Sequence, residues 1–222
     1  MKPRATAHLT AKLERKLLAY ATVATAAGIG VVTVPAEGKV VYTPARVLVG
    51  SGGLNSYNLD LNNDGVTDFV IDYSMTCDLA CYHDLSAINK DGMRSDGVAE
   101  ATRSHAALAF RQGAHIGPKK AFHPYPTPMV QVTTTSSGGS FLFGNWVNVK
   151  KRYLGLKFHA NGKVHFGWAR FNVRVEGANV TGTLTGYAYE TIHDKPIIAG
   201  DEGAGASLGK LALGAAGKKQ YP

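Results

Sequence analysis

A predicted β-hairpin in the second half of the chain constrains the fold most. Residues 153–158, YLGLKF, and residues 164–175, VHFGWARFNVRV, both alternate apolar and other side chains, which is the period of a β-strand. The linking ANGK contains Asn161-Gly162, the dipeptide that most strongly favours a two-residue hairpin turn. The sequence therefore predicts two antiparallel strands joined by a tight turn.

The apolar side chains change sides within residues 164–175. The first three share one side and the last three the other, in the order Val164, Phe166, Trp168, then Phe171, Val173, Val175. A strand with one buried face changes sides only if an extra residue is inserted, so we expect a β-bulge near Ala169-Arg170. We also expect Trp168 to be buried between two sheets together with Leu156 and Phe166.

Strand-like alternation continues over most of the chain after residue 39, where helical periodicity is nearly absent. Further strands are predicted in TDFVIDYS (67–74), MVQVTTT (129–135), SFLFGNWVNV (140–149) and VTGTLTGYAYET (180–191). Many short strands with Gly-rich turns indicate an all-β domain, a sandwich or a barrel, over residues 39–200.

Three stretches do not fit the strand pattern. Residues 76–105 are interpreted as a long loop with one helical turn. Residues 115–129, HIGPKKAFHPYPTPM, are interpreted as extended, polyproline-like surface chain because they are rich in proline. Residues 201–222 are rich in Gly and Ala and are interpreted as a flexible tail.

The first 38 residues have the organisation of a secretory signal peptide. Five Lys or Arg residues precede an uncharged apolar run from Leu17 to Val34, and Ala36-Glu37-Gly38 supplies small residues for cleavage before Lys39. An uncleaved N-terminal anchor is the alternative, because the run is close to the ~20 residues of a membrane span. We expect export with cleavage, to the periplasm, the cell surface or the medium, and no stable membrane span afterwards.

Cleavage would change the charge that a partner meets. Removing residues 1–38 of the 222 leaves 184 residues, takes away five Lys or Arg and two Asp or Glu, and lowers the formal net charge from +8 to +5. The remaining basic residues are scattered apart from Lys150-Lys151-Arg152 and Lys218-Lys219. Because a nucleic-acid site needs a concentrated basic patch, we do not expect nucleic-acid binding.

The chain has two cysteines, Cys77 and Cys81, in the segment TCDLACYHD. Their spacing in a turn is compatible with a disulfide, and an exported chain meets oxidising conditions. The alternative is a metal site formed by both cysteines with His83 and Asp84, although no second CxxC-type pair accompanies it. The disulfide is the preferred interpretation.

The segment DLNNDGVTD (60–68) resembles the first nine positions of an EF-hand-like calcium loop. Such a loop takes oxygens at positions 1, 3, 5, 7 and 9 and a glycine at position 6. The matching residues here are Asp60, Asn62, Asp64, Gly65, Val66 (through its carbonyl) and Asp68. Position 12 is Ile71 in place of the bidentate Glu, with Asp72 one residue late. The sequence predicts a calcium site, and a plain Asn-Asp-Gly turn is the alternative.

Three motifs resemble a widespread group of exported bacterial proteins. They are YLGLKFHANGKVHFGWARFNV, GYAYET and KPIIAG, and the similarity covers roughly residues 39–73 and 150–200. The group implies a secreted, jelly-roll-like antiparallel β-sandwich, similar in outline to laminin G and concanavalin A-like domains. It has no established activity and supplies no catalytic residues. Some members carry PEP-CTERM sorting tails, whereas this tail lacks Pro-Glu-Pro and Lys210 interrupts its apolar segment.

No catalytic constellation is apparent in the sequence. It contains no G-x-S-x-G motif, and Glu176 and Glu190 stand alone on their segments, whereas a retaining glycosidase needs two carboxylates about 5 Å apart. The sequence therefore predicts a non-catalytic protein of the envelope or matrix that is stabilised by calcium.

Carbohydrate binding is the main alternative function, and a glycan-active hydrolase is less favoured. Tyr125 and Trp146 could stack on sugar rings of an extracellular glycan, but on alternating strands Trp146 and Trp168 are more typical of core residues. His83, His105, His115 and His123 could form a site, but the sequence does not fix their geometry.

Overall fold

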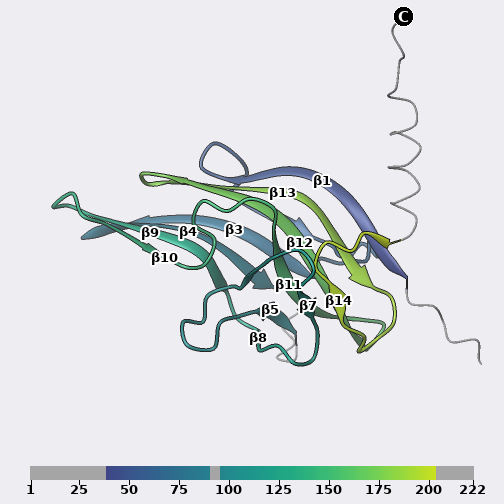
Figure 1. The fold of residues 1–222 in the computed structure, drawn as a ribbon. Coiled ribbons are helices and arrows are strands. Elements are labelled where there is room, and N and C mark those ends of the chain that lie inside the picture. The colour runs from purple at the N-terminus through teal and green to yellow at the C-terminus, as the bar shows by residue number, and fades with distance from the viewer. Residues whose placement is uncertain (1–38, 91–95, 204–222) are drawn as a thin grey trace, which may run out of the picture. The chain divides into compact units, whose positions relative to one another are not determined.

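Two antiparallel sheets face each other in the part of the chain that the computed structural model describes, residues 39–90 and 96–203 (Figure 1). The predicted all-β sandwich is therefore confirmed. The expected signal peptide (1–38) and residues 204–222 of the expected tail lie outside the described residues. Among the described residues, no helix is long and apolar enough to cross a membrane.

The larger sheet has seven strands. Their order is β1 (Val40–Gly50), β13 (Asn179–Glu190), β12 (Lys163–Glu176), β11 (Arg152–Ala160), β5 (Gly97–Ala99) and β8 (Phe122–His123), with β6 (Ala109–Phe110) also paired to β11.

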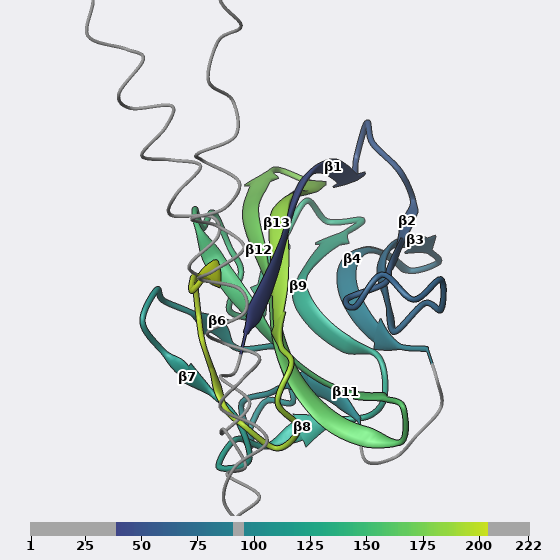
Figure 2. The same ribbon diagram turned by 90° about the vertical axis from the view of Figure 1, so that its right-hand side faces the viewer.

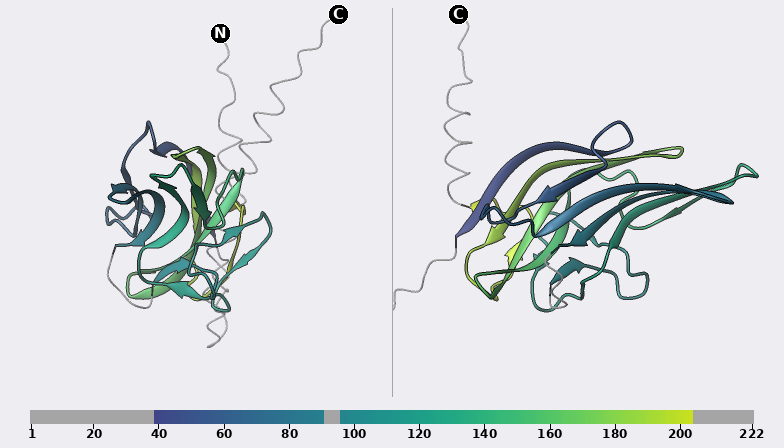
Figure 3. Two further views of the ribbon diagram at one scale, coloured as in Figure 1. Left: turned by 90° about the vertical axis from the view of Figure 1, so that its left-hand side faces the viewer. Right: turned by 180° about the vertical axis from the view of Figure 1, so that it is seen from behind.

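The smaller sheet has five strands. Their order is β10 (Ser140–Phe143), β9 (Thr127–Thr135), β4 (Ala80–Asn89), β3 (Phe69–Cys77) and β2 (Ser56–Leu59). A separate two-stranded ladder pairs β14 (Ile197–Ile198) with β7 (His115–Ile116). The tips of the β3–β4, β9–β10 and β12–β13 hairpins lie at the same end of the two sheets (Figure 3).

The predicted hairpin at Asn161-Gly162 is present between β11 and β12. Asn161 and Gly162 have φ values of 52° and 72°, and Ala160 pairs with Lys163 on either side of them. Two successive left-handed residues form the turn whose twist matches that of the strands.

The predicted irregularity near Ala169-Arg170 is present, but its cause differs from the expected one. The register between β12 and β13 shifts between Arg170 and Phe171, where the unpaired residue is Thr185 of β13. Because β12 pairs with β11 without interruption, its own alternation continues unbroken. The two apolar sets of this strand therefore lie on opposite faces of the sheet, and both faces are covered.

The main core lies between the two sheets and contains Leu156 and Phe171. Phe166 and Trp168 belong to a second apolar cluster, on the other face of the larger sheet, with Ile116 of β7 and Ile197 of β14. Figure 2 shows β7 on the side of β12 and β13 that faces away from β9 and β4. Trp168 is fully buried, as expected, but its predicted place between the sheets is wrong.

The interpretation of residues 76–105 as a long loop is wrong. They contain β4, a central strand of the smaller sheet, and β5. In their described part, the one helix-like turn is at residues 101–105, where the amides of Ser104 and His105 both donate to the Ala101 carbonyl. Residues 115–129 are also only partly irregular, because they include β7, β8 and the first residues of β9. In the predicted strand 140–149, only residues 140–143 form a strand.

Candidate functional site

The predicted calcium loop, residues 60–68, connects β2 to β3 at the edge of the smaller sheet. Leu59 pairs with Phe69 at its base, and the fully buried Leu61 anchors it in the core. Asn63 and Gly65 have left-handed backbones, with φ values of 58° and 89°. Glycine adopts such a conformation at little cost, so Gly65 permits the sharp turn that the motif requires.

Backbone amides of the loop hold three of the predicted ligands at its tip. The Asp60 carboxylate accepts hydrogen bonds from the amides of Gly65 (2.8 Å) and Asp64 (3.3 Å). Asn62 Oδ1 accepts from the Asp64 amide at 3.3 Å, and Asp64 Oδ1 accepts from the Val66 amide at 2.8 Å. The Asn62 amide also donates to Asp64 Oδ2 at 2.8 Å. The side chains of Asp60, Asn62 and Asp64 are therefore gathered around one turn.

The fourth predicted side chain, Asp68, occupies a different place in the loop. It is 7 % exposed, and its Oδ2 accepts a hydrogen bond from the Leu61 amide at 2.7 Å. This bond closes the base of the loop, so Asp68 has a structural role whether or not an ion is present. The network is compatible with both interpretations of the sequence, the calcium loop and the capped turn.

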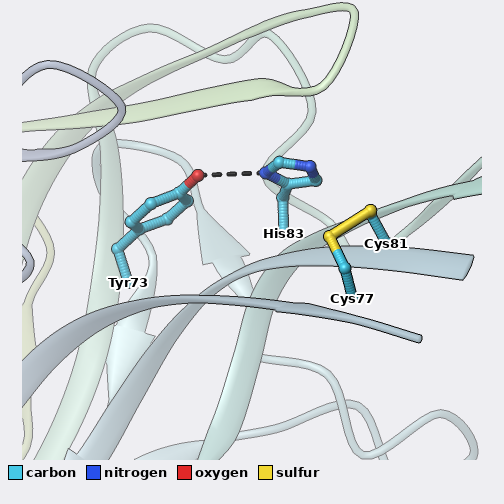
Figure 4. Close-up of a disulfide and its surroundings, with 4 residues drawn as sticks. All are labelled: Tyr73, Cys77, Cys81 and His83. Atoms are coloured by element: carbon cyan, nitrogen blue, oxygen red, sulfur yellow. Dashed lines mark hydrogen bonds between the residues drawn. A yellow bond between two sulfur atoms is a disulfide. The ribbon is translucent and has the colours of Figure 1, made fainter.

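Cys77 and Cys81 are joined by the expected disulfide across the end of the β3–β4 hairpin (Figure 4). The alternative cysteine metal site is therefore not formed. Further along the same two strands, the Tyr73 hydroxyl lies 3.0 Å from His83 Nδ1 and accepts a hydrogen bond from Ser51 Oγ at 3.1 Å. This polar chain links the two sheets at their hairpin end.

The outer face of the smaller sheet exposes aromatic side chains beside polar ones. Leu85 faces the core. Side chains alternate along a strand, so Asp84, one residue away, and Tyr82, three residues away, belong to the opposite face of β4. Tyr82, Phe141 and Phe143 are 44 %, 65 % and 41 % exposed. The strand register places this face in two neighbouring rows: Thr76, Tyr82, Thr133, Phe141; and Ser74, Asp84, Gln131, Phe143.

Asp84 lies in the middle of this face, in an environment that disfavours the ionised form of its carboxyl group. Its Oδ1 is buried and has no hydrogen-bond partner among the described residues. Burial raises the pKa of the Asp84 carboxyl; a hydrogen bond with Ser86 lowers it, and the nearby Asp72 carboxylate raises it further. A buried polar atom without a partner costs stability, so such a group in a native protein calls for an explanation.

The structure brings together two of the histidines whose geometry the sequence left open. His105 Nδ1 and His123 Nδ1 lie 3.0 and 3.4 Å from the same oxygen, Oε2 of Glu100. Among the described residues, this trio is the group of His, Cys, Asp or Glu residues whose ligand atoms all lie within 4.8 Å of one another. No local sequence pattern indicates this cluster, because its three residues are spread over residues 100–123.

Of the aromatic residues considered for stacking on sugar rings, the two tryptophans are buried and Tyr125 is exposed. Trp146 and Trp168 are fully buried, and Trp146 Nε1 donates a hydrogen bond to the Ala107 carbonyl at 3.1 Å. Both are therefore core residues. Tyr125 is 54 % exposed and its ring lies 5.4 Å from that of His123. His165 is buried and bonds the Glu190 carbonyl through Nδ1, so it also has a structural role.

Comparisons with protein-family models, with curated proteins and with solved structures found no match for this chain.

Proposed function

We propose that this protein is an exported, non-catalytic β-sandwich that binds a glycan of the cell envelope or extracellular matrix on the outer face of its smaller sheet. The observation that carries the proposal is the set of exposed rings on this face, Tyr82, Phe141 and Phe143, beside polar side chains. The three exposed rings lie on one sheet face, on the two strands β4 and β10 that flank β9. A clustered exposed apolar patch of this kind is typical of a binding site.

The chemistry of the face matches a sugar chain. Aromatic rings offer flat apolar surfaces to the C–H faces of pyranose rings, and the adjoining hydroxyl, amide and carboxylate groups can bond sugar hydroxyls. Asp72 and Asp84 would repel acidic sugars, so a neutral polysaccharide is the favoured class. Asp84 is half-buried on this face, so the accessible part of its carboxylate could accept a hydrogen bond from a sugar hydroxyl.

Two further features support an extracellular setting. The disulfide between Cys77 and Cys81 is compatible with an oxidising compartment, and the first 38 residues have the pattern of a signal peptide. The proposal includes a calcium ion at residues 60–68. Calcium accepts amide and carbonyl oxygens as well as carboxylates, so Asn62 and the Val66 carbonyl could complete a site with Asp60 and Asp64.

The test is a carbohydrate array that carries neutral and acidic polysaccharides, probed with the processed, secreted protein. We expect retention on one class of neutral polysaccharide, followed by a measurable dissociation constant in calorimetry. Tyr82→Ala and Phe141→Ala should each weaken binding at least tenfold. Ile198→Ala, which removes an exposed apolar side chain from the other side of the molecule, is the matched control and should bind as the wild type does.

Two outcomes would overturn the proposal. Failure to retain any polysaccharide, or equal retention by the wild type, Tyr82→Ala and Phe141→Ala, would remove the glycan site from this face. Release of shortened sugars from the bound polysaccharide would instead show a hydrolase and refute the non-catalytic part.

A further inference from the structure

The cluster of Glu100, His105 and His123 has the composition of a metal site. Imidazole nitrogens and a carboxylate oxygen are typical zinc ligands, and three protein ligands with an open fourth position are common at zinc sites. Bonds of about 2.0–2.1 Å separate neighbouring ligand atoms of a tetrahedral ion by roughly 3.3 Å. The observed separations from Glu100 Oε2, 3.0 Å to His105 Nδ1 and 3.4 Å to His123 Nδ1, are close to that value.

Paired backbone segments hold two of the three residues in place. Glu100 directly follows β5, where its amide donates to the Ala121 carbonyl at 3.0 Å and it forms a bridge with Ala107. His123 belongs to β8 and pairs with Val98 of β5. Both side chains therefore project from hydrogen-bonded backbone, which fixes ligands more accurately than a free loop does.

The third residue, His105, lies in a tight turn over residues 101–106. The amides of Ser104 and His105 both donate to the Ala101 carbonyl, and the Ala101 amide donates to the Ala106 carbonyl. His105 has a φ of 54°, in the left-handed region that non-glycine residues rarely adopt. Such strain is concentrated at functional sites, and here it brings the imidazole over Glu100.

The burial of the three side chains differs in a way that suits a surface-bound ion. The Glu100 side chain is only 9 % exposed, whereas those of His123 and His105 are 27 % and 64 % exposed. The carboxylate would gain a compensating charge in a poorly hydrated place, while the solvent side would leave one coordination position open.

We propose that Glu100, His105 and His123 bind a divalent transition-metal ion of the zinc class, with the fourth position open to water or to a donor atom of another molecule. This site is independent of the proposed glycan face and of the 60–68 loop. Two imidazoles favour zinc over calcium, whereas the all-oxygen loop favours calcium over zinc.

The test is calorimetric titration of the secreted, chelator-treated protein with zinc chloride, repeated with cobalt(II) chloride under visible spectroscopy. We expect one zinc ion per chain and the visible absorption of tetrahedral cobalt. His105→Gln and His123→Gln should each weaken zinc binding at least tenfold and abolish the cobalt spectrum. His105 is largely exposed, so its replacement should leave the fold intact, which thermal unfolding without metal verifies.

Two matched variants separate this site from the other candidates. His115→Gln removes an exposed histidine outside the cluster and should bind zinc as the wild type does. Asp64→Ala, in the 60–68 loop, should also leave zinc binding unchanged. Absence of zinc binding by the wild type would show that the cluster is an ion pair only. Equal zinc binding by the wild type, His105→Gln and His123→Gln would assign the ion elsewhere. Either result overturns the proposal.

Discussion

The two sheets of the sandwich differ in how many of their faces are covered. The central strand of the larger sheet, β12, packs Phe171 against the main core and Trp168 against the second cluster on its other face. Among the described residues, no second apolar cluster covers the outer face of the smaller sheet, which carries Tyr82, Phe141 and the half-buried Asp84. Buried side chains on both faces of the larger sheet stabilise the fold. The exposed rings of the smaller sheet contribute little to stability and are available for binding, and the buried oxygen of Asp84 lowers stability at neutral pH.

The largest expected effect is the loss of stability on Trp168→Ala. The side chain is fully buried over the larger sheet, its ring lies 5.1 Å from that of Tyr153, and removing so large a group from a packed site costs about 3–5 kcal/mol. Urea unfolding monitored by circular dichroism measures the change. Phe141→Ala, at a ring that is 65 % exposed on the smaller sheet, is the control and should change stability by less than about 0.5 kcal/mol. Similar losses of unfolding free energy for both variants would contradict the difference between the covered face of the larger sheet and the open face of the smaller one.

Calcium should give the next largest effect, at the edge of the smaller sheet. An ion that binds only the folded chain adds about 2.7 kcal/mol at 100 times its dissociation constant. Because position 12 lacks the bidentate Glu, affinity should be modest, in the range of about 10⁻⁴–10⁻³ M of extracellular modules.

Thermal unfolding in calcium, magnesium and chelator measures this calcium effect. The midpoint should rise with calcium in the wild type and in His123→Gln, but not in Asp64→Ala. Equal midpoints for the wild type in all three buffers would leave residues 60–68 as a hydrogen-bonded turn.

Loss of the disulfide should have a smaller effect. The ring closed by Cys77 and Cys81 spans four residue steps, so the chain-entropy estimate of its contribution is about 2 kcal/mol. Unfolding of the Cys77→Ser/Cys81→Ser variant should show this decrease, and the reduced wild type should match it. A much larger loss would mean that the disulfide also fixes the Tyr73–His83 contact behind it, which Tyr73→Phe would reveal.

The smallest expected effect concerns Asp84 and its pH dependence. Its pKa is raised in the folded state by burial, so the folded chain binds this proton more tightly than the unfolded chain does. Stability from this group is therefore present at low pH and is lost as the pH rises from about 3.9, the unfolded value, through the raised folded value.

Asp84→Asn should consequently stabilise the protein at pH 7, and the gain should shrink towards pH 4. Urea midpoints over this range measure it, with Asp78→Asn at an exposed position as the charge-matched control. A gain that does not change with pH would contradict the burial of the carboxyl. If Asp84 bonds a sugar as proposed, the same substitution should weaken glycan binding.

Local sequence patterns predicted the elements whose causes are local. Asn161-Gly162 gave the hairpin turn, and the alternation around it gave β11 and β12. The position of Trp168 was not predictable in this way, because the sequence does not say that β7 and β14 cover the second face of the sheet. The bulge was assigned to β12 for the same reason. In a sequence, apolar residues on both faces of one regular strand give the same pattern as a strand with one buried face that is interrupted by a bulge.

The strand β4 was not predicted because apolar and polar side chains do not alternate along it. Its inner face carries Cys81 and His83, whereas its outer face carries Tyr82 and Ile88, so neither face is uniformly apolar. The 60–68 loop could be recognised because all its candidate ligands lie within nine residues. The Glu100 cluster could not, since the pairing of β5 with β8 and a strained turn at His105 bring it together.

The most direct test of the distinction between the sheets compares two variants in one pair of assays, glycan calorimetry and urea unfolding. Tyr82→Ala/Phe141→Ala should lose glycan affinity at least a hundredfold and keep its unfolding free energy within about 1 kcal/mol of the wild type. Trp168→Phe should be less stable and keep its glycan affinity. Retained affinity in the double variant, or lost affinity in Trp168→Phe at a temperature where it is folded, would contradict the assignment of binding to the open face of the smaller sheet.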